Sequence, residues 1–129
     1  MATTKQTPTT VEEAVKQNPD LEMPTDLSPN GRKAWRAIME FLVARGLTYT
    51  GGCKAFYSPS EWRARGEKYG TVSELVVVYD GGEVRYAFEL DTAFEVGGYQ
   101  ITEAMIEQLA KVGLWSECCT CWYSAIYNG

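Results

Sequence analysis

The chain has 129 residues, of which 45% are hydrophobic and 22% are charged, and it carries a net charge of −5. These values are typical of one globular domain that is long enough to bury a core. No apolar run approaches the roughly 18 residues of a membrane span, and the N-terminus lacks the pattern of a signal peptide, so we expect a cytoplasmic protein with no membrane contact. Histidine is absent, which excludes Ser-His-Asp catalysis, Cys-His catalysis and zinc sites that use imidazole.

The charges are distributed unevenly along the chain. Residues 1–70 hold ten Lys and Arg against eight Asp and Glu, whereas residues 71–129 hold two against nine. The stretch from Arg32 to Lys68 holds eight basic and three acidic residues. Such an imbalance is common on solvated surfaces, and the alternative is a bipolar protein whose charged side meets a charged partner.

Residues 1–27 are rich in Thr, Pro, Gln, Glu and Lys, which predicts a flexible N-terminal tail. A short helix is expected inside it, because Thr10 and Glu13 have the spacing of a capping box. Residues 28–129 are then expected to form a single α+β domain. Its first helix begins after Ser28, a good N-cap, with Pro29 at the first helical position.

That first helix carries an apolar stripe at spacings of three and four residues, and Gly46 is its expected C-cap. The stripe consists of Ala34, Trp35, Ile38, Phe41 and Leu42. Gly51 and Gly52 predict a turn before a strand that ends at Tyr57. Ser58, Pro59 and Glu61 form the clearest local signal in the chain, a capping box that opens a short helix over Pro59–Arg65.

Two strands, Ser73–Asp80 and Glu83–Leu90, are predicted to form a hairpin around the turn residues Asp80-Gly81-Gly82. A helix capped by Thr102 and ended by Gly113 follows. The closing stretch Leu114–Tyr127 is expected to be one inner strand, because both of its alternating faces carry large side chains.

Together these elements predict an α+β two-layer sandwich. It has a mostly antiparallel sheet of about four strands, two main helices on one face, and an additional short helix. The strand order is left open.

The four cysteines are Cys53, Cys118, Cys119 and Cys121. A zinc site would use Cys53, Cys119 and Cys121, but a Cys-Cys-x-Cys run on a strand lacks the spacing of a zinc knuckle. A disulfide from Cys53 to Cys119 or Cys121 is a further alternative if those strands pair, although cytosolic thiols stay reduced. We therefore expect no metal and no cofactor, with the thiols buried as small hydrophobes.

The aromatic residues are more numerous than one small sheet must bury, and Tyr, Trp and Arg dominate protein interfaces. The predicted binding patch lies on and beside the short helix, which we expect to be a surface helix with Trp62, Arg63 and Arg65 exposed. It consists of Trp62, Arg63, Arg65, Tyr57 and Lys54.

Two stretches, Thr-Gly-Gly-Cys-Lys-Ala-Phe-Tyr-Ser-Pro at 50–59 with Glu61-Trp62, and Cys-Thr-Cys-Trp-Tyr-Ser-Ala-Ile-Tyr at 119–127, resemble those of small uncharacterised proteins of phages and other mobile elements. The resemblance implies an accessory protein of the inhibitor or modulator type in the host cytoplasm, with no known activity or catalytic residues.

The leading hypothesis is a non-enzymatic binding protein that occupies a surface of a host macromolecule, most readily a protein. The first alternative is nucleic-acid binding through the basic, aromatic segment 32–68. The second is a thiol-dependent enzyme or a cysteine-zinc protein. The oligomeric state is left open.

Overall fold

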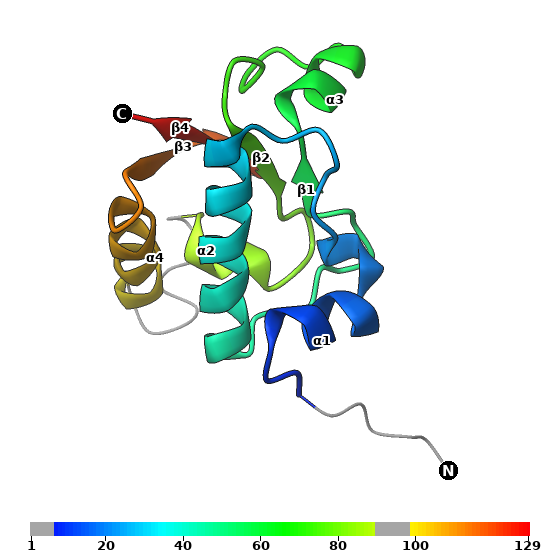
Figure 1. The fold of residues 1–129 in the computed structure, drawn as a ribbon, viewed down its shortest axis with the longest axis vertical. Coiled ribbons are helices and arrows are strands. Elements are labelled where there is room, and N and C mark those ends of the chain that lie inside the picture. The colour runs from blue at the N-terminus through cyan, green and yellow to red at the C-terminus, as the bar shows by residue number, and fades with distance from the viewer. Residues whose placement is uncertain (1–6, 90–98) are drawn as a thin grey trace.

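The computed structural model describes residues 7–89 and 99–129 (Figure 1). Its helices and strands, with two short 3-10 turns η1 and η2, follow in the order α1(Val11–Gln17), η1(Pro19–Leu21), α2(Pro29–Arg45), β1(Phe56–Tyr57), α3(Pro59–Ala64), β2(Leu75–Val78), η2(Val84–Ala87), α4(Gln100–Ala110), β3(Leu114–Thr120), β4(Tyr123–Asn128). None of the described helices combines the length and the apolar character needed to cross a bilayer.

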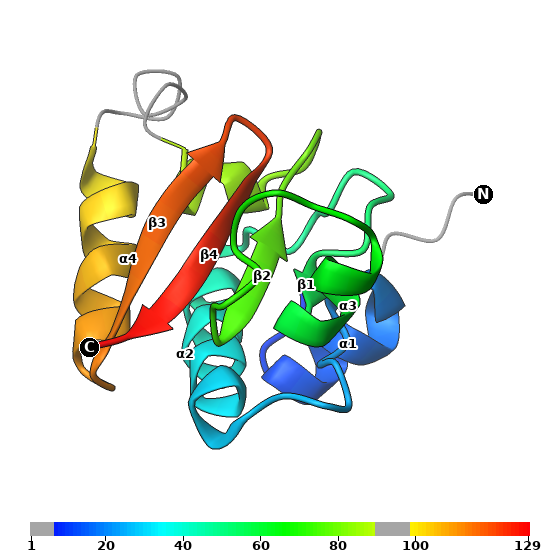
Figure 2. The same ribbon diagram turned by 90° about the horizontal axis from the view of Figure 1, so that it is seen from above.

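The strands form one antiparallel sheet with the order β1-β2-β4-β3. Helices α2 and α4 pack side by side on one face of this sheet, and the smaller α3 lies against the other face (Figures 1 and 2). The predicted α+β fold, with four strands and two main helices on one face, is confirmed.

Helix α2 forms where the sequence predicts it. The Ser28 hydroxyl accepts a hydrogen bond from the Gly31 amide at 3.0 Å, and Gly46 ends the helix with a φ of +68°. The Ser28 hydroxyl also donates to the Glu74 carboxylate at 2.6 Å, which ties the start of α2 to the start of β2. The predicted apolar stripe of α2 is buried throughout.

The prediction of a flexible tail over residues 1–27 is wrong from Val11 onward; residues 1–6 lie outside the described part. The Thr10 hydroxyl caps α1 as predicted, accepting from the Glu13 amide at 3.1 Å. Val11, Ala14, Leu21 and Leu27 are all buried in the main core. These few apolar residues recur at the positions that face α2, so a segment with a polar composition still buries a continuous apolar edge.

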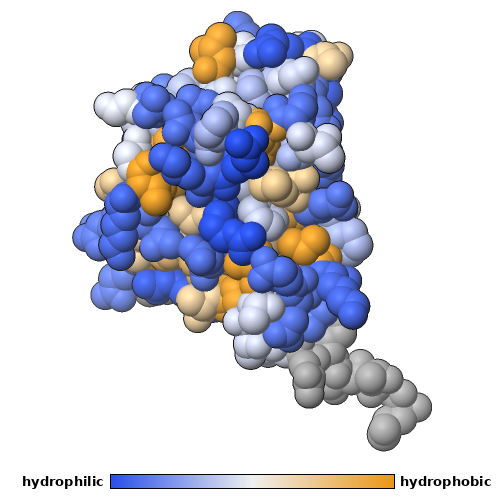
Figure 3. All heavy atoms as spheres, viewed as in Figure 1, coloured by the Kyte–Doolittle hydropathy of each residue, from blue (hydrophilic) through white to orange (hydrophobic). Residues whose placement is uncertain are grey.

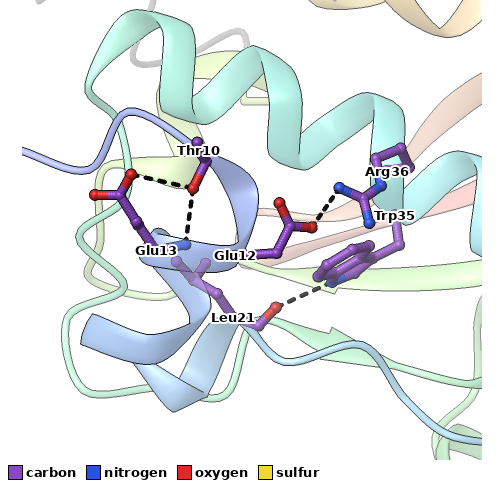
Figure 4. A network of polar contacts seen from close by, with 6 residues as sticks. All are labelled: Thr10, Glu12, Glu13, Leu21, Trp35 and Arg36. Atoms are coloured by element: carbon purple, nitrogen blue, oxygen red, sulfur yellow. Dashed lines mark hydrogen bonds and ion pairs between the residues drawn. The ribbon is translucent and has the colours of Figure 1, made fainter.

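Two contacts fasten this N-terminal segment to α2 (Figure 4). The buried indole of Trp35 donates to the Leu21 carbonyl oxygen at 3.0 Å. On the surface, Arg36 pairs with Glu12 at 2.9 Å. The domain therefore begins well before residue 28.

The predicted hairpin forms only its first strand, β2. Residues 84–87 adopt the 3-10 turn η2 instead of a strand, and Leu90 lies outside the described residues. Val84 and Phe88 are nevertheless buried, as the alternating pattern predicts. A spacing of four residues fits a turn of helix as well as it fits one face of a strand, and here the core determines which conformation forms.

The closing stretch is a hairpin of two strands, β3 and β4, and not one inner strand. The chain reverses at Cys121 and Trp122, with a bulge between Cys118 and Thr120. Strand β4 is the inner strand, and β3 is the edge of the sheet. The reversal contains no Gly, Asn, Asp or Pro, which are the residues that usually indicate a turn. The sequence therefore predicts one continuous strand.

Helix α4 begins earlier than predicted, after Tyr99, and Thr102 lies inside its first turn. The Thr102 hydroxyl is buried and donates to the Tyr86 carbonyl oxygen at 3.4 Å. The predicted core residues Met105 and Leu109 are fully buried.

Candidate functional site

Strand β2 separates two apolar clusters because its side chains alternate between the sheet faces. Leu75 and Val77 face α2 and belong to the main core. Val76 and Val78 face the opposite side, where they pack with Trp62 and Tyr123 in a second, smaller cluster.

Trp62 is the centre of this second cluster and is fully buried. Helix α3 holds it in place through the predicted capping box, in which Ser58 and Glu61 exchange hydrogen bonds of 3.1 and 2.9 Å. The Trp62 indole donates to the Tyr69 carbonyl oxygen at 2.9 Å. The single N–H group of this indole is thus hydrogen-bonded to the segment that follows α3.

Aromatic rings surround Trp62 on three sides. Its ring centroid lies 5.0 Å from that of Tyr57, 4.9 Å from that of Tyr123 and 5.8 Å from that of Trp122. Tyr57 and Trp122 are only half-buried, so the cluster reaches the surface through these two rings. Tilted and edge-on pairs at such distances are favourable and hold the rings in one arrangement.

Two cations lie over the outer edge of the cluster. The guanidinium carbon of Arg65 is 4.8 Å from the Trp62 ring centroid and 5.2 Å from that of Tyr57. The Lys54 ammonium is 4.7 Å from the Tyr57 ring centroid and pairs with Glu61 at 3.0 Å. Burial by itself raises the pKa of Glu61, but the Ser58 amide and the Lys54 ammonium outweigh it and lower that pKa below its usual range. Arg65 also pairs with Glu67 at 3.2 Å, so the rim of the cluster is a shelf of two ion pairs whose cations lie over aromatic rings.

The structure brings together four of the five predicted binding residues, Lys54, Tyr57, Trp62 and Arg65, but it corrects the role of Trp62. Trp62 was predicted to be exposed on a surface helix, and it is buried because α3 packs onto the sheet face that the two main helices leave open. Arg63 is exposed and points away from the shelf, donating to the Thr71 carbonyl oxygen.

The far end of the same sheet face carries aromatic residues that are not part of the predicted binding patch. Trp115 of β3 and Tyr127 of β4 stand opposite each other and stack with ring centroids 4.9 Å apart. Trp115 is 46% exposed. We call the surface formed by Tyr57, Trp115, Trp122 and Tyr127 the aromatic face. The sequence did not predict the exposure of Trp115, because nothing in it indicates the reversal at residues 121–122 that places Trp115 on an edge strand.

The cysteines do not gather at one site. Cys53 lies beside β1 and donates to the Asp80 carbonyl oxygen at 3.2 Å, whereas Cys119 and Cys121 belong to the β3–β4 hairpin. All four thiols are free, so the disulfide alternative is not formed.

The prediction that the thiols are buried is wrong, because Cys118 and Cys121 are exposed and Cys53 and Cys119 are half-buried. Partial burial, followed by the nearby Glu117 carboxylate, raises the pKa of Cys119 to about 11. Its thiol therefore stays protonated at neutral pH and is a poor nucleophile. Within residues 7–89 and 99–129, no group of three or more Cys, Asp or Glu side chains is arranged to hold a metal ion.

Comparisons with known proteins add no assignment. No protein-family model matches the chain, and neither the curated proteins nor the solved structures yielded a match.

Proposed function

We propose that this protein is a non-enzymatic binding protein, of the accessory type encoded by phages or mobile elements, that docks a protein partner on its aromatic face. The observation that carries the proposal is the exposed Trp115–Tyr127 stack on a sheet face that α3 covers only in part. Exposed, rigidly held Trp and Tyr rings are the side chains that contribute most to protein interfaces.

The aromatic face has the features of an interface that is formed before the partner arrives. Trp122 and Tyr57 pack on buried Trp62, so their rings lose little conformational entropy on binding. Arg65 and Lys54 supply charge at one end, and the exposed carboxylate of Glu117 lies on the same face of β3 as Trp115. Such a pattern favours a partner with apolar groups flanked by charges of both signs.

Nucleic-acid binding through residues 32–68 is weakened by the position of the basic residues. Arg32, Lys33, Arg36 and Arg45 lie on α2, while the remaining four lie on or near α3, on the other side of the sheet. A phosphate backbone would meet only about half of them at once, and the salt-dependent affinity scales with the number of phosphates neutralised.

A thiol-dependent enzyme or a cysteine-zinc protein has less support. The raised pKa of Cys119 opposes nucleophilic catalysis, and within the described residues no group of three Cys, Asp or Glu side chains is arranged to hold a metal ion. We therefore retain the binding protein as the function that the geometry supports best.

The test is site-specific photo-crosslinking with the full chain in cell extract of its source organism. A photoreactive phenylalanine derivative at position 117, which is exposed on the same face of β3 as Trp115, is expected to capture a defined protein. Tyr127→Ala is expected to weaken that capture at least ten-fold, since hot-spot residues contribute about 2 kcal/mol or more. The matched control is Tyr49→Ala, which removes a tyrosine that is 61% exposed and lies outside the aromatic face.

Capture that persists in Tyr127→Ala, or that Tyr49→Ala weakens equally, would place the binding surface elsewhere. Capture of nucleic acid and not protein by the same probe would support the nucleic-acid alternative instead.

A further inference from the structure

A groove runs between α2 and α4 on the helical side of the molecule, where the two helices lie side by side (Figure 1). It encloses a volume of about 500 Å³ and is lined by the first half of α2 and the C-terminal end of α4. The face that holds it is mainly hydrophilic, with isolated hydrophobic groups between the polar ones (Figure 3).

Cations dominate the rim of this groove. Arg32, Lys33, Arg36 and Lys111 line it, with Glu40 as the one acidic residue among its lining side chains. Arg36 pairs with Glu12, but neither Lys33 nor Lys111 has an ion-pair partner within the described part of the chain. A local excess of positive charge in a protein with a net charge of −5 therefore remains uncompensated there.

The floor of the groove is apolar. Ala37 and Val112 form it, and the side-chain amide of Gln108 donates to the Ala37 carbonyl oxygen at 3.1 Å, which occupies its polar group. The start of α2 and the C-terminal end of α4 both line the groove, so their helix dipoles oppose each other, and the positive potential comes from the rim side chains. The groove thus combines an apolar floor with a cationic rim.

We propose that the α2–α4 groove docks an acidic, amphipathic segment of a protein partner. Apolar side chains at helical spacing would lie on Ala37 and Val112, while flanking carboxylates would reach Lys33 and Lys111. Charge complementarity selects an acidic segment, because Lys33 and Lys111 carry charges without an ion-pair partner among the described residues. They would attract carboxylates, repel a basic segment and gain little from a neutral one.

A nucleic acid fits this groove less well than an acidic peptide does. None of the described residues that line it is aromatic, so it offers no ring on which a base could stack. The negative charge of the whole chain also opposes the approach of a long polyanion.

The groove and the aromatic face lie on opposite sides of the sheet. A partner segment on α2 and α4 therefore leaves Trp115 accessible, and the two surfaces can bind simultaneously. The inference does not depend on the proposed function, because each surface is tested with variants that leave the other unchanged.

The test uses the full chain and three fluorescent probes at low salt. They are a sixteen-residue helical peptide with leucines on one face and glutamates on its flanks, the same composition in scrambled order, and an oligothymidylate of twenty nucleotides. The amphipathic peptide is expected to bind most tightly. Lys33→Ala/Lys111→Ala is expected to weaken it about ten-fold, because two exposed charge pairs contribute up to about 1 kcal/mol each.

The matched control is Lys16→Ala/Lys68→Ala, which removes two exposed lysines that do not line the groove. The proposal is supported if the control variant binds the amphipathic peptide as the unmodified chain does and the groove variant does not. Three results overturn it: no peptide binding at low salt, equal binding of the scrambled peptide, or tighter binding of the oligothymidylate that the groove variant abolishes.

Discussion

Helices α2 and α4 cover one face of the sheet with a large apolar core, whereas among the described residues only α3 and the segment that follows it cover the other face. The main core draws residues from every helix except α3, including the N-terminal segment. The second cluster has four buried members, and its neighbours Tyr57, Cys119 and Trp122 are partly exposed.

The difference shows that the two faces of one sheet can be packed to very different extents. The large core joins almost every helix to the sheet, so it stabilises the whole domain cooperatively. A small cluster built on one tryptophan holds surface rings in place without burying them. The rings of the aromatic face stay partly exposed because the described part of the chain covers that face of the sheet incompletely.

The largest expected effect comes from removing the centre of the small cluster. Trp62→Ala should lower the free energy of unfolding by about 3–5 kcal/mol. It leaves a large cavity, and the rings that pack on Trp62 lose their contacts with it. Urea denaturation measures the loss. Ile38→Ala in the main core is the matched variant, with an expected cost of about 2–5 kcal/mol.

Hydrogen exchange separates these two variants. Trp62→Ala should increase exchange mainly in α3 and residues 65–73, while Ile38→Ala should increase it throughout the domain. Uniform exchange in both variants would show that the two clusters unfold as one unit.

A pair of glycines gives the next largest effect. Gly66 and Gly70 both have a φ of +79°, but a Cβ on Gly66 meets open space, whereas one on Gly70 lies 3.2 Å from the Cβ of Ala125 on β4. Gly66→Ala should cost about 1–2 kcal/mol for the backbone alone. Gly70→Ala should cost about 1 kcal/mol more, because it pushes the segment after α3 away from the sheet. Thermal unfolding measures both losses of stability. Equal losses in the two variants would mean that the segment moves away from Ala125 at no cost in free energy.

A smaller effect is expected at the buried hydroxyl pair between β2 and β4. Tyr79 and Ser124 share a hydrogen bond of 2.8 Å on the helix-covered side. Tyr79→Phe should cost about 1–2 kcal/mol because it leaves the Ser124 hydroxyl without this partner. The double variant Tyr79→Phe/Ser124→Ala should recover part of that loss, and a strictly additive double variant would contradict the pairing.

The smallest effect concerns the charge of Glu61. The folded-state pKa of this residue is lowered, so its carboxylate contributes stability that is fully present above about pH 4.5 and is lost as the pH falls through the folded-state value. Glu61→Gln keeps an oxygen for the capping box and should cost less than about 1 kcal/mol at pH 7. The difference from the unmodified chain should shrink below pH 4.5, as urea midpoints across pH would show; a difference that grows would reverse the sign of the assigned shift.

The elements with strong local signals could be predicted from the sequence. Helix α2 and helix α3 begin after Ser28 and Ser58 because a hydroxyl N-cap followed by Pro stabilises a helix start through contacts within a few residues. Strand β2 is equally clear from its run of β-branched residues. These signals also led to the correct fold class.

The candidate site could be predicted only in part. Lys54, Tyr57 and Arg65 follow one another closely around α3, so their clustering is a local matter. The burial of Trp62 and the exposure of Trp115 depend on which sheet face α3 covers and on where the closing hairpin turns. Both depend on contacts between residues far apart in the chain.

The sequence by itself determined where helices start, which residues of α2 face the core, and that the chain forms an α+β domain, because caps and hydrophobic periodicity act over a few residues. Only the tertiary structure decided that residues 11–27 join the core, that residues 84–87 leave the sheet, and that residues 114–127 fold back on themselves. In each of these cases the local preferences are weak or balanced, and the conformation that buries the most apolar surface against distant parts of the chain prevails.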